Sequence, residues 1–182
     1  MITCGLWAAS IHAATGRKPL SLESTANRCF VCGPSNSIGL KVRFRLDDDV
    51  CRAEFTPQDE HVGYDGVTHG GILFSLLDDV MANWVFLRGE RCYTARAEVR
   101  YRKPLPIGTP VRLEGRQEKR RGRLATLSGK IIRQDDDSVV AEASARFMVE
   151  ARPHGRVRAP SRARSRALAP LHAPRLPPSE KW

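Results

Sequence analysis

The feature that most constrains the fold of this chain is a single helical segment among segments of alternating polarity. Between residues 70 and about 87, apolar side chains recur at intervals of three and four, as on one face of a helix. The segments before and after it alternate between apolar and polar residues, as strands do. One helix between a hairpin and a long meander predicts an α+β fold, in which an antiparallel sheet wraps around one central helix. The helical stripe comprises Leu73, Leu76, Leu77, Val80, Met81 and Trp84.

The expected strands are separated by turn-forming residues. Residues 41–46 and 50–55 alternate around an acidic turn at residues 47–49, which predicts a hairpin. After the helix, residues 93–101, 110–120, 123–133 and 138–150 predict four more strands. We expect Ala95, Ala97, Val99 and Tyr101 to share one face of the first of these, and Val139, Ala141, Ala143, Ala145, Phe147 and Val149 to share one face of the last.

The basic charge of the chain lies mostly outside the expected domain. The formal net charge is +10, of which residues 151–182 carry +7 and residues 27–150 only +2. Residues 151–182 also hold six of the twelve prolines, so we expect a disordered Arg/Pro/Ala-rich tail there and a disordered leader over residues 1–26. Residues 27–150 form the expected domain. Because its own charge is nearly balanced, we expect no nucleic-acid partner. The expected tail is a solvated extension, and the alternative is an Arg-rich arm that contacts RNA, DNA or anionic lipid.

Hydropathy and cysteine content indicate the cellular compartment and whether the chain binds a metal. No apolar run approaches the ~18 residues of a membrane span, so we expect no membrane partner. The five cysteines are an odd number, which favours a reducing, cytoplasmic compartment over a disulfide framework. Cys29 and Cys32 form a CxxCG motif that resembles half of a zinc site, but no second CxxC supplies two more ligands. We therefore expect no bound metal, and the reason for the motif stays open.

Two neighbouring aspartates interrupt the apolar run of the helix. At ~100° per residue, Asp78 falls at the edge of the apolar stripe, whereas Asp79 points away from it beside Ile72 and Asn83. We expect Asp78 to be the half-buried carboxylate. Burial raises the pKa of a carboxyl group and makes it a candidate base or nucleophile. The alternative is that both carboxylates are solvated on the polar face.

Gly70 and Gly71 lie where the helix is expected to begin. The N-terminus of a helix carries unpaired N–H groups and the positive end of the helix dipole. Without side chains there, a ligand can approach the backbone closely, and an amide could hold an oxygen that gains negative charge in a transition state. Alternatively, Thr68 caps the helix and the glycines only turn the chain.

Together these residues resemble a known family. His69, Gly70 and Gly71, with an acid nine positions after the histidine, are similar to the hotdog-fold acyl-CoA thioesterases of the phenylacetate-pathway and 4-hydroxybenzoyl-CoA type. Residues 29–40 (CFVCGPSNSIGL), 61–71 (HVGYDGVTHGG) and 100–108 (RYRKPLPIG) carry the same resemblance, which covers about residues 29–150. It implies the hotdog fold and hydrolysis of an acyl-CoA to free acid and CoA, with no cofactor.

The resemblance also implies roles for individual residues. The HGG segment, His69 to Gly71, would present the Gly71 amide to the thioester carbonyl, and Asp78 would either attack that carbonyl or activate water. Thr94 matches a hydroxyl residue that helps in some members. In relatives a polar residue often stands six positions before the HGG histidine; here that position is Gly63, and His61 would act in its place.

Coenzyme A carries a pyrophosphate and a 3′-phosphate, so we expect arginines along its path. The resemblance indicates Arg102 after the strand tyrosine and Gly122 with Arg123 in the following hairpin. Arg100 and Arg121 lie beside them in the sequence and are further candidates. The alternative for residues 118–123 is an ordinary solvated hairpin.

The spacing of Gly71 and Asp78 predicts an assembly. Seven residues span roughly 10 Å along one helix, whereas both groups must come within ~3 Å of one reacting carbonyl. Two antiparallel helices across a two-fold axis satisfy this requirement, so we expect shared active sites in a homodimer, as in the family, or in a dimer of dimers (a homotetramer). Two alternative functions remain, a non-catalytic acyl-CoA-binding hotdog protein and a hotdog dehydratase or hydratase.

Overall fold

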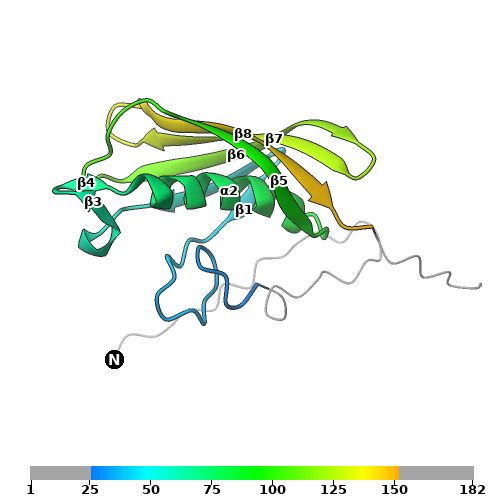
Figure 1. Ribbon diagram of the computed structural model, residues 1–182, viewed down its shortest axis with the longest axis horizontal. Helices are drawn as coiled ribbons and strands as arrows, with labels where there is room; N and C mark the ends of the chain where they lie inside the picture. Colours follow the sequence, from blue (N-terminus) through cyan, green and yellow to red (C-terminus); the bar gives the residue numbers. More distant parts are fainter. Residues whose placement is uncertain (1–25, 152–182) are drawn as a thin grey trace, which may run out of the picture. The chain divides into compact units, whose positions relative to one another are not determined.

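The computed structural model describes residues 26–151, so the expected tail from residue 152 and nearly all of the expected leader lie outside the described residues. A six-stranded antiparallel sheet curves around one helix (Figure 1), which confirms the expected α+β hotdog architecture. The elements in chain order are β1 (Arg45–Asp47), β2 (Val50–Phe55), a 3-10 helix (Asp59–His61), β3 (Val62–Tyr64), β4 (Val67–Thr68), α2 (Gly70–Phe86), β5 (Cys92–Tyr101), β6 (Val111–Arg121), β7 (Leu124–Arg133) and β8 (Val139–Val149).

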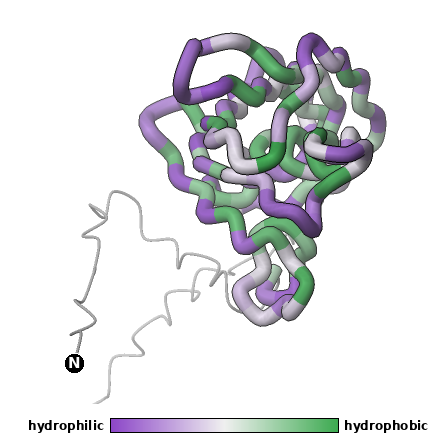
Figure 2. The backbone as a smooth tube through the Cα atoms, turned by 90° about the vertical axis from the view of Figure 1, so that its left-hand side faces the viewer, coloured by the Kyte–Doolittle hydropathy of each residue, from purple (hydrophilic) through white to green (hydrophobic). Residues whose placement is uncertain are grey.

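The order of strands in the sheet is β1-β2-β6-β7-β8-β5, so β1 and β5 form its two edges. Strands β3 and β4 make a separate two-stranded ribbon directly before α2, which the alternation of the sequence did not predict. Hydrophilic segments dominate the outer loops, whereas hydrophobic segments run through the middle (Figure 2). Within residues 26–151 no helix is long and apolar enough to cross a membrane.

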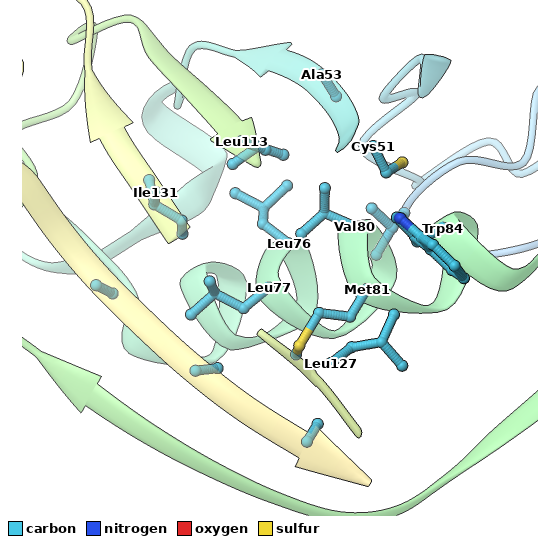
Figure 3. Close-up of a cluster of buried hydrophobic side chains, with 14 of the residues drawn as sticks. Cys51, Ala53, Leu76, Leu77, Val80, Met81, Trp84, Leu113, Leu127 and Ile131 are labelled. Carbon is cyan, nitrogen blue, oxygen red and sulfur yellow. The ribbon is translucent and has the colours of Figure 1, made fainter. Parts of the chain in front are cut away.

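The expected apolar stripe of α2 forms the centre of the core. All six of its members are buried, and Leu76, Leu77 and Val80 are fully buried. In Figure 3 the side chains of Leu76, Leu77 and Val80 lie on the side of the helix that faces the strands of Leu113 and Ile131. Burying one such side chain stabilises the fold by about 1.5–3 kcal/mol. The stripe therefore fixes which face of α2 lies on the sheet.

A row of small residues lets α2 approach the middle of the sheet. Gly115 on β6 pairs with Gly129 on β7, which in turn pairs with Ala143 on β8. A Cβ atom on Gly115 would lie 2.6 Å from the carbonyl oxygen of Val80. Because that neighbour is helix backbone, it cannot rotate away, and only glycine permits this approach.

The first strand is shorter than expected: it begins at Arg45 rather than at residue 41. Lys41 has a positive φ of 59°, and its ammonium group donates to the carbonyl oxygen of Pro34 at 3.0 Å. The N–H group of Val42 donates to the carbonyl oxygen of Val31 at 2.9 Å. The backbone of this stretch therefore pairs with the loop that carries the CxxCG motif instead of with β2.

A β-bulge corrects the expected face of β5. The register with β8 shifts between Thr94 and Arg96, so Ala95 is the extra residue. Ala95 is exposed, whereas Ala97 and Val99 pack against the core as expected. A residue count alone would put Thr94 and Ala97 on opposite faces, but a bulge between them places both on the face toward α2.

A second shift corrects the expected face of β8. The register with β7 changes between Ile131, which pairs with Ala141, and Ile132, which pairs with Val139. The extra residue, Val140, is fully buried, whereas Val139 is only half-buried. The other members of the expected face, from Ala141 to Val149, are buried as predicted.

Candidate active site

The helix α2 begins at a histidine cap. His69 has an extended backbone, and its Nδ1 atom accepts a 2.9 Å hydrogen bond from the N–H group of Gly71. The alternative that Thr68 caps the helix is therefore wrong; its hydroxyl is buried without a hydrogen-bond partner among the described residues. The hydroxyl of Tyr101 donates to the carbonyl oxygen of Gly70 at 3.1 Å and links the end of β5 to this turn.

The His69 cap bears directly on the expected role of Gly71. The amide that we expected to polarise a carbonyl already donates to the imidazole ring of the same turn. The His69 side chain is exposed, so a ligand oxygen can reach the amide if the ring turns away. His69, Gly70 and Gly71 are thus brought together at the N-terminus of α2, where His69 accepts the hydrogen bond of the Gly71 amide.

Asp78 lies on the side of α2 that faces the edge strand β5. Its Oδ1 atom accepts a 2.7 Å hydrogen bond from the hydroxyl of Thr94. Burial raises the pKa of Asp78, and the hydrogen bond from Thr94 lowers it in part. The bulge at Ala95 is what turns Thr94 toward the helix. The pairing of Asp78 with Thr94 joins two of the expected site residues in one contact.

Asp79 points away from the sheet, as expected, but it is not solvated. The loop that carries the CxxCG motif covers it, and its Oδ1 atom lies 3.8 Å from the Sγ atom of Cys29. Its Oδ2 atom accepts a 3.0 Å hydrogen bond from the side chain of Asn83. Burial raises the pKa of Asp79 to about 6. Both carboxylates are therefore half-buried, and the alternative that both are solvated is wrong.

His61 lies on the other side of the turn that precedes α2. Its Nδ1 atom accepts a 2.8 Å hydrogen bond from the N–H group of Gln58, and its ring packs 5.2 Å from that of Phe55. Its carbonyl oxygen accepts from the N–H group of His69 at 2.8 Å. A Cβ atom on Gly63 would lie 2.9 Å from the Cα atom of His69, so a polar side chain at position 63 does not fit here.

The expected coenzyme A arginines do not gather in one place. Arg102 follows the end of β5 and forms an ion pair with Glu142 at 2.5 Å, and Arg100 is exposed beside it. Arg121, Gly122 and Arg123 form the turn between β6 and β7, next to the beginning of β5; Gly122 has a φ of 57° there. The two groups are thus separated by the length of β5, roughly 30 Å at ~3.3 Å per residue.

Known thioesterases are similar to this chain in sequence. A family model described as the thioesterase superfamily matches residues 65–140, which span α2 and the strands β5 to β7. The acyl-coenzyme A thioesterase THEM4 of Xenopus laevis is 35% identical over 95 residues, which make up 52% of this chain and 42% of that protein. The chain thus spans less than half the length of this curated relative.

Solved structures of thioesterase superfamily proteins are also similar to this chain. A crystal structure of a thioesterase superfamily protein is 31% identical with a TM-score of 0.60, over 65% of this chain and 61% of that chain. A phenylacetic acid degradation-related protein of Ralstonia eutropha JMP134 is 25% identical with a TM-score of 0.56, over 67% of this chain and 95% of that chain. The chain therefore has the hotdog fold, with one helix held by a six-stranded antiparallel sheet, and its sequence is similar to those of thioesterase superfamily proteins.

Proposed function

We propose that this protein is an acyl-CoA thioesterase, which hydrolyses the thioester bond of an acyl-CoA to a free acid and CoA. The observation that carries the proposal is the half-buried Asp78, held by Thr94 on the helix whose N-terminus presents Gly71. The name of the curated relative, an acyl-coenzyme A thioesterase, supports the choice of substrate.

Asp78 would supply the base or the nucleophile of the reaction. As a base, its carboxylate takes a proton from a water molecule whose oxygen attacks the thioester carbonyl. The carbonyl oxygen gains negative charge, which the amide of Gly71 stabilises at the positive end of the α2 dipole. The C–S bond then breaks, and the CoA sulfur leaves and takes up a proton. As a nucleophile, Asp78 would form an acyl anhydride that water hydrolyses in a second step.

The two groups would come from different subunits of a homodimer. Gly71 and Asp78 lie seven residues apart on one rigid helix, roughly 10 Å at ~1.5 Å per residue. Strand β5 supports a two-fold contact, because among the described strands it pairs with β8 alone and exposes Tyr93 (62%) and Tyr101 (55%). Exposed edges of this length are a template for pairing with a second strand.

The contacts of β5 show what such pairing would bring together. Antiparallel pairing of β5 with β5 of a second chain, about a two-fold axis near the middle of the strand, would bring the Thr94 end of one strand toward the Tyr101 end of the other. Tyr101 contacts Gly70, so the second helix N-terminus would approach Thr94 and Asp78. The same axis would bring the β6–β7 turn of one chain toward the Arg100 and Arg102 end of the other, which joins the two groups of arginines for the phosphates of CoA.

A non-catalytic acyl-CoA-binding protein is the second candidate. The observation that favours it is the bond between the Gly71 amide and His69, because it occupies the donor that hydrolysis needs. Such a protein would bind acyl-CoA without releasing CoA. Release of the free thiol is therefore the measurement that separates the two candidates.

The experiment is an assay of thiol release from a panel of acyl-CoA and acyl-carrier-protein thioesters. We expect turnover of at least one acyl-CoA, and a loss of at least ~100-fold in kcat for Asp78→Asn, the scale for removing a general base or nucleophile. Asp79→Asn is the neighbouring comparison, with the melting temperature of each variant measured. An Asp78→Asn variant with wild-type kcat, above all if Asp79→Asn is inactive, would refute the assignment.

A further inference from the structure

The CxxCG motif forms a tight turn directed at the sulfur of Cys29. The N–H groups of Val31 and Cys32 lie 3.3 and 3.5 Å from this sulfur and donate to it. A Cβ atom on Gly33 would lie 2.4 Å from the backbone nitrogen of Cys29, so the turn closes only with glycine. Two backbone N–H donors therefore hold this sulfur in a fixed position within the turn.

Asp79 supplies a third ligand atom from the helix. The Sγ atoms of Cys29 and Cys32 and a carboxylate oxygen of Asp79 all lie within 4.8 Å of one another. Tetrahedral zinc, with Zn–S bonds of ~2.3 Å and Zn–O bonds of ~2.1 Å, needs S···S and S···O separations of about 3.8 and 3.6 Å. The distance of 3.8 Å from Cys29 Sγ to Asp79 Oδ1 is close to the S···O separation that zinc needs.

A second contact orients the carboxylate for this role. The side-chain amide of Asn83 donates to the Oδ2 atom of Asp79 at 3.0 Å and to its backbone oxygen at 2.9 Å. Asn83 is buried, one turn further along α2. It therefore occupies one oxygen and leaves Oδ1 directed at the sulfurs. Outer contacts of this kind hold metal-binding carboxylates in place.

The fourth position of the site is open to a cavity. This cavity has a volume of about 280 Å³, and Cys29, Cys32 and Asp79 lie in its wall together with Phe86 and Tyr93. A water molecule or a small ligand fits there. Two thiolates and one carboxylate with an open position match a soft or borderline divalent ion such as zinc, and not the oxygen-only sites of calcium or magnesium.

We propose that Cys29, Cys32 and Asp79 bind one zinc ion, which ties the loop before β1 to the helix that carries Asp78. The ion would take the place of two thiol protons and join segments 50 residues apart in the sequence. Its binding energy would therefore stabilise the folded chain. Cys29, Cys32 and Asp79 take no part in the proposed hydrolysis, so this proposal does not depend on it.

The test is zinc binding by the full chain in reducing buffer, after its metal has been removed with a chelator. We expect about one zinc per chain and a higher melting temperature in the presence of zinc. Loading with Co²⁺ should add a thiolate-to-cobalt charge-transfer band in the near ultraviolet. We expect Cys29→Ser and Cys32→Ser to lose the bound zinc and the band, and Asn83→Ala to bind about 10–100-fold more weakly. Cys51→Ala is the matched control and should retain both.

Three outcomes would overturn the proposal. One is a wild-type chain without saturable zinc binding. Another is a Co²⁺-loaded wild-type chain without the thiolate band, which decides the question even if the cysteine variants do not fold. The third is equal zinc binding by the Cys29→Ser and Cys32→Ser variants and by the wild type. Hydrolysis measured alongside is a separate readout, so its presence or absence bears only on the proposed function.

Discussion

The hydroxyl of Thr94 donates a 2.7 Å hydrogen bond to the Oδ1 atom of Asp78, across 16 residues of sequence. This contact links the central helix to the edge strand β5. It gives the carboxylate a fixed orientation and opposes the rise in its pKa that burial causes. The pair therefore offers a way to test the role of Asp78 without removing its carboxylate.

We expect Thr94→Val to move the acidic limb of the pH profile of kcat/KM to higher pH. The active form of Asp78 is the carboxylate, so activity is lost as the pH falls through the pKa of Asp78. Burial raises this pKa and the Thr94 hydroxyl lowers it, so removing the hydroxyl raises it further. Thr94→Ser keeps the hydroxyl and should leave the limb in place. If the pH profiles of kcat/KM coincide for the Thr94→Val variant and the wild type, then Asp78 does not control this limb.

The cap of α2 predicts a change in stability. We expect His69→Ala to lower the free energy of unfolding by about 1 kcal/mol, because the N–H group of Gly71 loses its acceptor. His69→Asn supplies another good cap and should recover most of this loss. Urea unfolding of the three proteins measures the difference. An Asn variant as unstable as the Ala variant would mean that the imidazole acts through packing and not as a cap.

The proposed sharing of active sites predicts complementation between inactive chains. A Cβ atom on Gly71 would meet only the movable ring of His69, at 2.9 Å, so Gly71→Val should fold while blocking the amide. We mix this variant with Asp78→Asn under conditions of subunit exchange. Random exchange gives about half heterodimers, each with one intact site and one doubly damaged site, so activity should reach about a quarter of wild type.

Each variant alone, assayed at the same total concentration, is the control for complementation. If activity stays at the level of the single variants although exchange is demonstrated by mass spectrometry, then both groups act from the same chain. The separation of roughly 10 Å along α2 would then not require a second chain.

The contact between Gly115 and Val80 predicts a large loss of stability. Because a Cβ atom at position 115 would lie 2.6 Å from a helix carbonyl oxygen, we expect Gly115→Ala to destabilise the fold by about 1–3 kcal/mol. Gly129→Ala is the matched control. Its Cβ atom would meet the flexible side chain of Met81 at 3.2 Å, so a smaller loss is expected. Equal losses in thermal unfolding would show that the approach of helix and sheet can relax.

Local periodicity was enough to predict the main elements. The helix was expected from residue 70 to about 87 and runs from Gly70 to Phe86, and the four strands after it agree with their expected ranges to within one residue. The reason is that apolar spacing of 3.6 or 2 residues follows directly from the geometry of each element. The strand expected from residue 41 was too long, because Lys41 and Val42 pair with a loop that alternation does not reveal.

The amino-acid sequence by itself determined the fold class, the buried face of α2 and the place of Asp78 at the edge of that face. Only the tertiary structure decided what each carboxylate contacts. Asp78 contacts Thr94 because a bulge at Ala95 turns the hydroxyl toward the helix, and Asp79 contacts Cys29 because a loop 50 residues earlier folds beneath α2. Strand register and loop placement depend on contacts between distant segments, and no local pattern of residues specifies them.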